Sequence, residues 1–291
     1  MKNLPLPSFP KIAIVSILSL ASVTLIAQQR PAGGAGGPRP GGTPRDEAPF
    51  SGMIAANDAN KDGALSKSEI SKLRNFSESL FDVIDTNGDG IISLAEAKGA
   101  DKVDTQKGPP KRIDFEGKQW IADHAIGAEI VDYKGKKAFH IVGREQCLVY
   151  LPIDDFQDGT IEVDIAGDIF SGIGFRVRDK GTRAEKLYFR PQNANTDRHQ
   201  NTVQYSVLGR RDGHWSQLRR NFPGKYESGA GIAKGEWFRA RLEIKGEALK
   251  VYANGTLLLT VDPMLDGVTK GSVGIWGWDS YFANFKYTPA K

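Results

Sequence analysis

Two twelve-residue stretches place oxygen-bearing side chains at a spacing that suits a divalent cation. "DANKDGALSKSE" begins at Asp58 and "DTNGDGIISLAE" begins at Asp85. In each stretch the first, third, fifth, ninth and twelfth positions carry Asp, Asn, Asp, Ser and Glu, and the sixth is glycine. A hard cation of the size of calcium takes about six to eight oxygen ligands, which one loop of this length can supply. The pattern therefore predicts two calcium sites.

The ligands expected in each loop are five side chains and the backbone carbonyl of the seventh residue. They are Asp58, Asn60, Asp62, Ala64, Ser66 and Glu69 in the first loop, and Asp85, Asn87, Asp89, Ile91, Ser93 and Glu96 in the second. The glycine allows the sharp turn that a Cβ would obstruct. This pattern resembles the EF hand, and the short spacing is similar to compact bacterial EF-hand pairs. Dockerins are the alternative, but they usually carry Asp at the twelfth position. The resemblance implies two calcium ions as cofactors.

Residues 49–104 are expected to form this small all-α EF-hand pair. Between the loops, Ile70 and Leu73 fit one face of a helix, and Phe76, Leu80, Phe81 and Ile84 fit one face of the next. The eighth loop positions, Leu65 and Ile92, are apolar. We expect them to pair the two loops through a short strand contact.

The N-terminal segment predicts export. Lys2 and Lys11 precede an apolar run from Ile12 to Ile26, and Ala27 offers a small residue for cleavage. Residues 1–27 therefore read as a signal peptide, with an uncleaved anchor as the alternative; no stable membrane span is expected after cleavage, because a span needs about 20 apolar residues. Residues 28–48 are rich in Gly and Pro and are expected to be a disordered linker.

Charge and cysteine content exclude several function classes. Residues 51–104 have a net charge of −4 and residues 105–291 a net charge of +5. The positive charges are scattered among acids, so no nucleic-acid partner is expected. Cys147 is the only cysteine and lies in the apolar run "QCLVYLP", which favours a buried core position. The four histidines show no metal-ligand spacing.

From residue 113 onward the chain reads as a series of short strands. Segments such as "GTIEVDIAG", "GIGFRVRD" and "EALKVYANG" alternate apolar and polar residues and are separated by Gly, Asp or Asn. Asn254–Gly255 is the signal for a two-residue hairpin. We expect an all-β antiparallel jelly-roll sandwich over residues 113–291, giving a multidomain chain. Residues 105–112 contain Gly and two Pro and are expected to be a linker that leaves the two domains thermodynamically independent.

The C-terminal segments resemble a known superfamily. "FSGIGFRVRD", "EKLYFRPQNA", "GEWFRARLEIKGEALKVYANG" and "GSVGIWGWDSYFANFKYT" follow one another as in laminin-G-like domains. The resemblance, over roughly residues 113–289, is to concanavalin A-like lectin/glucanase jelly rolls. That superfamily includes sugar-binding modules, glycoside hydrolases and a 3-keto-disaccharide hydrolase-like group, so the fold alone implies no single activity.

Strand alternation suggests where a ligand would bind. If the strands are neighbours, one polar sheet face carries Glu162, Asp164, Arg176, Arg178, Tyr188, Arg190 and Gln204. Arg and amide groups hydrogen-bond adjacent hydroxyls, and aromatic rings stack on sugars. The candidate ligand-binding residues are Arg176, Tyr188, Arg190, Gln204, Trp276 and Trp278. The alternative is an ion-paired, solvated sheet face with the tryptophans in the core.

No intact catalytic motif is present. "EVDIAGD" resembles the family 16 glycoside hydrolase pattern, but Ala166 or Gly167 stands where a second Glu is expected. Glu162 and Asp164 are the best carboxylates if the domain is a glycan-processing enzyme. The sequence thus predicts an exported calcium-binding protein with a carbohydrate-binding or other extracellular-ligand-binding sandwich. An enzyme, or a structural protein with calcium as a staple, remains the alternative, and the oligomeric state stays open.

Overall fold

The computed structural model describes residues 49–73, 76–104, 111–144 and 147–290. The predicted signal peptide (1–27), the predicted disordered linker (28–48) and residues 105–110 of the predicted linker lie outside these ranges. No helix in the described ranges is long and apolar enough to cross a membrane. The EF-hand pair and the sandwich belong to one compact unit of the chain.

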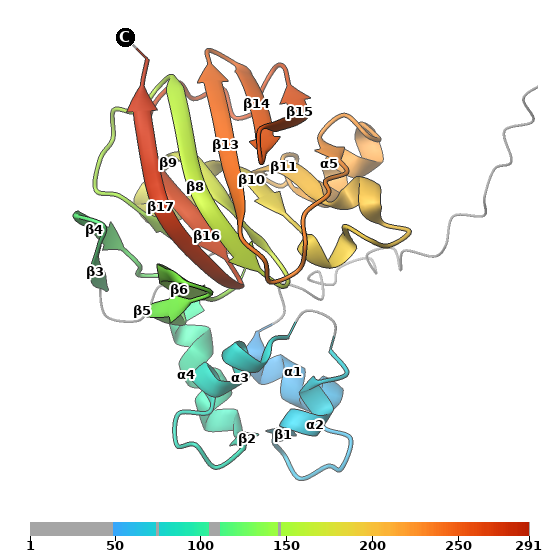
Figure 1. Cartoon of the computed structure of the whole chain (residues 1–291). Helices are drawn as coiled ribbons and strands as arrows, with labels where there is room; N and C mark the ends of the chain where they lie inside the picture. Colours follow the sequence, from blue (N-terminus) through green and yellow to red (C-terminus); the bar gives the residue numbers. More distant parts are fainter. Residues whose placement is uncertain (1–48, 74–75, 105–110, 145–146, 291) are drawn as a thin grey trace, which may run out of the picture. The chain divides into compact units, whose positions relative to one another are not determined.

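Residues 50–104 form the predicted pair of helix–loop–helix units (Figure 1). Their elements are α1 (Phe50–Asn57), β1 (Leu65–Ser66), α2 (Lys67–Ile70), α3 (Glu78–Ile84), β2 (Ile91–Ile92) and α4 (Leu94–Asp104). The start of α1 is held by Asp101 of α4, whose carboxylate accepts bonds from the Phe50 N–H (2.5 Å) and the Ser51 hydroxyl (2.6 Å). Leu65 pairs with Ile92 in an antiparallel bridge, so the predicted contact between the loops is confirmed.

The rest of the chain forms two antiparallel sheets. In spatial order, the eight-stranded sheet consists of β12 (Glu227–Ser228), β11 (Val203–Leu208), β10 (Arg183–Phe189), β9 (Ser171–Arg178), β16 (Ser272–Gly277), β7 (Leu148–Tyr150), β4 (Lys118–Ile121) and β3 (Arg112–Phe115). The seven-stranded sheet consists of β15 (Thr256–Val261), β14 (Ala248–Ala253), β13 (Phe238–Lys245), β8 (Gly159–Gly167), β17 (Asp279–Pro289), β6 (Lys136–Val142) and β5 (Gly127–Tyr133). Figure 1 shows the first sheet behind the second. The predicted all-β sandwich is confirmed.

Strand alternation builds the core between the sheets. In β13, Phe238, Ala240 and Leu242 are buried, while Arg239 and Arg241 on the other side are not. Inward side chains from both sheets join one hydrophobic cluster, which includes the predicted core residue Cys147. Helix α5 (Trp215–Asn221) and the short 3-10 turns at Asp179–Gly181, Pro191–Asn193 and His199–Asn201 lie in the connections between strands.

The hairpin between β14 and β15 follows the predicted turn. Asn254 and Gly255 both have positive φ, 48° and 81°, and they are the two residues between the strands. β15 lies at one end of the seven-stranded sheet, and its Leu257 is 51% exposed.

A β-bulge shifts the alternation in β9. Arg176 has a φ of 51°, and the pairing of β9 with both neighbours shifts register at this point. Phe175 therefore faces the core between the sheets, whereas Val177 joins the cluster on the outer side of the sheet. The regular alternation that assigned Arg176 and Arg178 to the predicted polar face is therefore interrupted in β9.

The EF-hand pair shares its hydrophobic core with the sandwich. Ile126 and Val142, which lie beside β5 and at the end of β6, cluster with Leu80, Phe81 and Ile84 of α3. A Cβ added at Gly127 would lie 2.9 Å from a methyl of Val83, so the two surfaces are in close contact. This contact argues against the expectation of two thermodynamically independent domains, which stays a prediction to be tested by calcium-dependent melting.

Candidate functional site

The first predicted calcium loop is closed by its own hydrogen bonds. The Asp58 carboxylate accepts bonds from the backbone N–H groups of Asp62 (3.2 Å) and Gly63 (2.8 Å). Glu69 reaches across the loop, where Oε1 accepts from the Ala59 N–H (2.8 Å) and Oε2 from the Ser66 N–H (2.9 Å) and hydroxyl (2.7 Å). Ser66 and Glu69 form the capping box of α2, so the start of the helix fixes the last ligand of the loop.

The second loop repeats the main bonds of this arrangement and adds one from the Gly88 N–H to Asp85 (2.9 Å). Asp85 accepts from the N–H groups of Asp89 (3.2 Å) and Gly90 (2.9 Å). Glu96 accepts from the Thr86 N–H (2.9 Å) and from the Ser93 N–H (2.9 Å) and hydroxyl (2.7 Å). Gly63 and Gly90, the sixth residues, both have a φ of 85°. The same spacing of polar residues thus gives similar loop conformations in both units.

The donor set of each loop suits a hard cation. Hydrogen bonds from the Ser66 and Ala59 backbone and the Ser66 hydroxyl lower the pKa of Glu69 to about 2. Burial raises the pKa of Glu96, but bonds from Ser93, Asn87 and Thr86 lower it to about 2. Both glutamates are thus ionised at neutral pH, as calcium ligands must be. In the described ranges no three Asp, Glu, His or Cys side chains are grouped closely enough to hold a metal ion.

The predicted ligand-binding residues are brought together only in part. Gln204 on β11 and Tyr188 on the adjacent β10 lie on the outer side of the eight-stranded sheet. Trp276 lies on the same side on β16, which β9 separates from β10, and Arg190 and Trp278 directly follow β10 and β16. The six candidates, Arg176, Tyr188, Arg190, Gln204, Trp276 and Trp278, are all buried, none more than 6% exposed. Arg176 lies apart from the rest, because the bulge directs its guanidinium to the carbonyl of Gly246 (2.6 Å).

Arg190 occupies the centre of an aromatic cluster. Its guanidinium donates to the Tyr188 hydroxyl (2.8 Å) and to the Asn201 carbonyl (2.9 Å). It lies 5.3 Å from the ring centre of Trp215, which has Arg219 at 5.0 Å. Trp215 and Phe170 are only half-buried. Strand alternation missed Phe170, because this residue lies in the connection between β8 and β9.

The two alternative catalytic carboxylates lie elsewhere. Glu162 and Asp164 belong to β8 of the seven-stranded sheet, so they do not share a face with Tyr188 and Gln204 as the neighbouring-strand hypothesis required. Asp164 accepts bonds from Lys136 (2.6 Å), Arg239 (3.1 Å) and Asn284 (2.6 Å). Burial raises the pKa of Asp164, but these bonds outweigh it and hold the pKa below its ordinary value. Asp164 therefore fits an ion-paired structural role.

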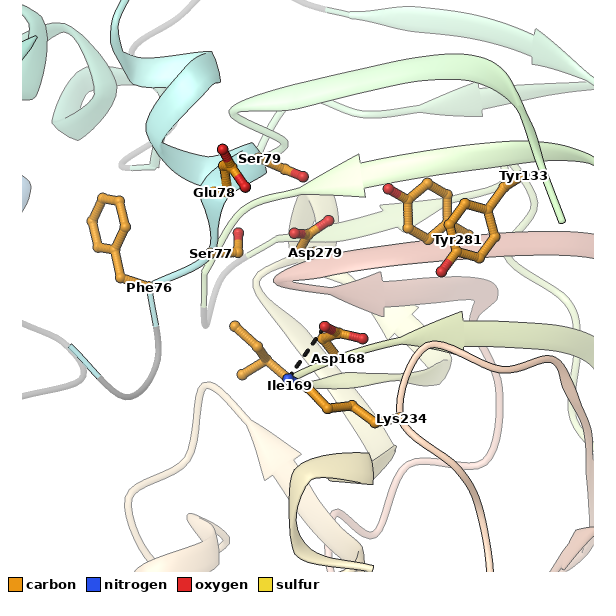
Figure 2. A pocket seen from close by; sticks show the side chains of 10 residues that line it. All are labelled: Phe76, Ser77, Glu78, Ser79, Tyr133, Asp168, Ile169, Lys234, Asp279 and Tyr281. Atoms are coloured by element: carbon orange, nitrogen blue, oxygen red, sulfur yellow. Dashed lines mark ion pairs between the residues drawn. The ribbon is translucent and has the colours of Figure 1, made fainter. Parts of the chain in front are cut away.

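A cavity of about 340 Å³ lies where the start of α3 meets the seven-stranded sheet (Figure 2). Its lining comes from separate parts of the chain: Phe76, Ser77, Glu78, Ser79, Tyr133, Asp168, Ile169, Lys234, Asp279 and Tyr281. The sequence did not indicate it, because these residues form no local motif.

Two lining residues of this cavity, Tyr133 and Tyr281, belong to a row of stacked rings. Tyr281 lies between Tyr133, with ring centres 3.7 Å apart, and His140, with ring centres 4.3 Å apart. His140 Nε2 lies 2.8 Å from the Asp279 carboxylate, which also takes hydrogen bonds from Ser77 and Ser79. Burial, followed by the nearby Asp279, raises the pKa of Tyr281 to about 12, so this phenol keeps its proton.

Comparison with known proteins identifies the first module. Residues 56–73 and 78–96 match the EF-hand family, which implies calcium binding. None of the curated proteins matches the chain.

Solved structures with a similar β-sandwich include sugar-binding proteins. They include the carbohydrate-binding module CBM66 from Bacillus subtilis (13% identity, 57% of this chain, 92% of that chain, TM-score 0.41). A Caenorhabditis elegans galectin is also similar (11% identity, 49% of this chain, 91% of that chain, TM-score 0.35). A third is a Parabacteroides distasonis protein provisionally described as a glycosyl hydrolase (12% identity, 56% of this chain, 85% of that chain, TM-score 0.38).

Proposed function

We propose that this is an exported protein that binds one calcium ion in each EF-hand loop and recognises a hydroxyl-rich ligand, such as a glycan, through its β-sandwich. The observation that carries the calcium part is the hydrogen-bond pattern that the two loops share. Each loop contains two aspartates, an asparagine, a serine and an ionised glutamate. Hydrogen bonds between these side chains and the loop backbone close the loop.

The aromatic cluster around Arg190 supports the ligand part. Half-buried Trp215 and Phe170 border it, and such rings stack on the C–H faces of sugars. Within the described residues, the buried Nε1 of Trp278 has no hydrogen-bond partner. A buried donor of this kind is costly unless an acceptor such as a ligand or water satisfies it.

Calorimetry tests the calcium stoichiometry. The chelator-stripped wild type should take up two calcium equivalents. Glu69→Gln and Glu96→Gln should each take up one, because each replaces an essential carboxylate with a neutral amide. Glu247→Gln, a change at an exposed glutamate outside the loops, should still take up two. Absence of heat at millimolar calcium in the wild type would refute the proposal.

A glycan array tests the ligand. Trp215→Ala should weaken binding to any retained glycan about tenfold, since loss of a stacking ring costs on the order of 1 kcal/mol or more. Phe222→Ala is the matched control, because this aromatic residue is exposed outside the cluster. Release of reducing sugar from the same glycans would instead support the glycan-processing alternative.

Export is tested by fusing residues 1–27 to a reporter without a signal. The fusion should leave the cytoplasm and lose the segment after Ala27. A reporter that stays cytoplasmic would refute this part.

A further inference from the structure

We propose that the cavity between the start of α3 and the seven-stranded sheet binds a neutral, hydroxyl-rich ligand of the size of one sugar residue, and that calcium in the second loop strengthens this binding. The site is separate from the aromatic cluster around Arg190. Its link to calcium rests on the calcium part of the proposed function.

The size and walls of the cavity suit a small polyol. Its volume, about 340 Å³, is at the lower end of the range of small-molecule sites, which is roughly 300–1,000 Å³. Ile169 and the half-buried Phe76 supply apolar surface. Asp168 and Lys234 lie side by side in the lining as an ion pair at 3.3 Å (Figure 2). Adjacent hydroxyls of one sugar can accept from the ammonium and donate to the carboxylate.

The state of each carboxylate favours a neutral ligand over a charged one. Asp279 is already bonded to His140, Ser77 and Ser79, and Asp168 is paired with Lys234. The third lining carboxylate, Glu78, lies 3.5 Å from the ammonium of Lys67. A cationic ligand would therefore have to compete with one of these partners. An anionic ligand would face Glu78, Asp168 and Asp279 with one ammonium in the lining to attract it. A neutral ligand would neither displace an existing partner nor be repelled by the carboxylates.

The ion pair is open enough to serve a ligand. The side chains of Asp168 and Lys234 are 53% and 59% exposed. An exposed pair contributes only about 0–1 kcal/mol, so rearranging it around a ligand costs little. Both residues can be substituted without disturbing the core.

Helix α3 connects the cavity to the second calcium loop. Ser77, Glu78 and Ser79 at its start line the cavity, and its last residue, Ile84, directly precedes the calcium ligand Asp85. The helix has seven residues and is about 10 Å long. Leu80, Phe81 and Ile84 anchor it to Ile126 and Val142 of the sandwich. An ion that orders Asp85 therefore also orders the wall of the cavity.

Saturation-transfer NMR and calorimetry on the full mature chain test the proposal, with glucose, galactose, mannose and their methyl glycosides as probes. At least one probe should bind the calcium-loaded protein. If a free sugar binds and its methyl glycoside does not, the ligand is a free monosaccharide. If the methyl glycoside also binds, the ligand is a sugar residue within a glycan. Binding by none of them, or binding of methylammonium in place of every sugar, would overturn the ligand class.

Substitutions locate the binding. Asp168→Asn and Lys234→Gln should each lower the affinity for the sugar probe that binds by about fivefold or more. The controls Asp155→Asn and Lys250→Gln change exposed residues outside the cavity and should leave affinity unchanged. Binding that survives both cavity substitutions would overturn the assignment to this site.

Chelation tests the linkage. Removing calcium should lower the affinity for the sugar probe by about fivefold or more. The probe should raise the affinity for calcium by the same factor, because such coupling is reciprocal. Equal probe affinity with and without calcium would overturn the linkage. A protein that takes up no calcium would refute the proposed function itself, and the cavity substitutions would still decide the ligand site.

Discussion

At Arg190 a charged side chain has become part of the packing. Strand alternation assigns it to an open polar face, yet it is 6% exposed, bonded to Tyr188 and Asn201, and in contact with the Trp215 ring. Arginine satisfies such a position because its planar group stacks on rings while its edge donates hydrogen bonds. Its side chain therefore supports the cluster from within.

Arg190→Ala should consequently destabilise the sandwich, not only weaken a ligand. Loss of packing and an unpaired Asn201 carbonyl should cost about 2–4 kcal/mol. Arg183→Ala, at a side chain 45% exposed, should change stability by no more than about 0.5 kcal/mol. Urea unfolding followed by tryptophan fluorescence measures both. Equal stability of the two variants would show that Arg190 is not structural.

Glu185 is a second buried charge, and it predicts a pH dependence. Its side chain is fully buried and accepts hydrogen bonds from the Tyr205 hydroxyl and from the Asp266 N–H (3.0 Å). Burial raises its pKa to about 7 from 4.5. The folded state therefore holds a proton that the unfolded state releases between these values, so stability is lost as pH rises from about 4.5 to about 7.

The loss from this group should reach about 3 kcal/mol at most. Glu185→Gln mimics the protonated form and should remove this part of the pH dependence. Urea unfolding of both proteins at pH 5.5 and 7.5, with saturating calcium, measures the difference. The same change with pH in both proteins would place the dependence on another group.

At the scale of elements, glycines in the second EF-hand unit have opposite roles. Gly90 has a φ of 85°, which side chains disfavour, whereas Gly99 lies inside α4, exposed and with nothing within 4 Å of an added Cβ. Gly99→Ala should raise the free energy of unfolding by about 0.5–1 kcal/mol through helix propensity. Gly90→Ala should lower it and weaken calcium binding. Chemical denaturation of the two variants measures both signs, and a stabilising Gly90→Ala would contradict the strain argument.

The sequence predicts elements well where a short segment contains all the information. The calcium loops, the Asn254–Gly255 hairpin and the inward alternation of β13 each depend on residues close in sequence. The prediction of one polar face is wrong because the local sequence does not determine which strands are neighbours. β8 pairs with β13 and β17, not with β9. A single residue with positive φ, Arg176, then reversed the alternation within β9. The cavity required five separated segments to meet, which no spacing pattern reveals.

At the scale of the whole molecule, the shared core predicts that calcium stabilises the sandwich. Ile126 and Val142 cannot leave α3 without exposing apolar surface. All five tryptophans lie beyond residue 112, so their fluorescence reports the sandwich alone. Saturating calcium should raise the melting temperature seen by tryptophan by about 5 °C or more, since binding at 100 times Kd contributes about 2.7 kcal/mol per site.

The variant carrying both Glu69→Gln and Glu96→Gln is the control and should show little response to calcium. If calorimetry shows calcium binding but the melting temperature of the wild type, followed by tryptophan fluorescence, is the same with and without calcium, the two domains are independent.

The unpaired edge of strand β15 affects the tendency of the protein to self-associate. Within the described residues no strand pairs with its outer side, so a row of N–H and C=O groups is open to another chain. Its sequence, "TLLLTV", has no charge and no proline, the composition that favours intermolecular strand addition and aggregation. Concentrated solutions should therefore lose material by precipitation as the protein is warmed, and a lysine at exposed position Leu257 should act as a gatekeeper against it.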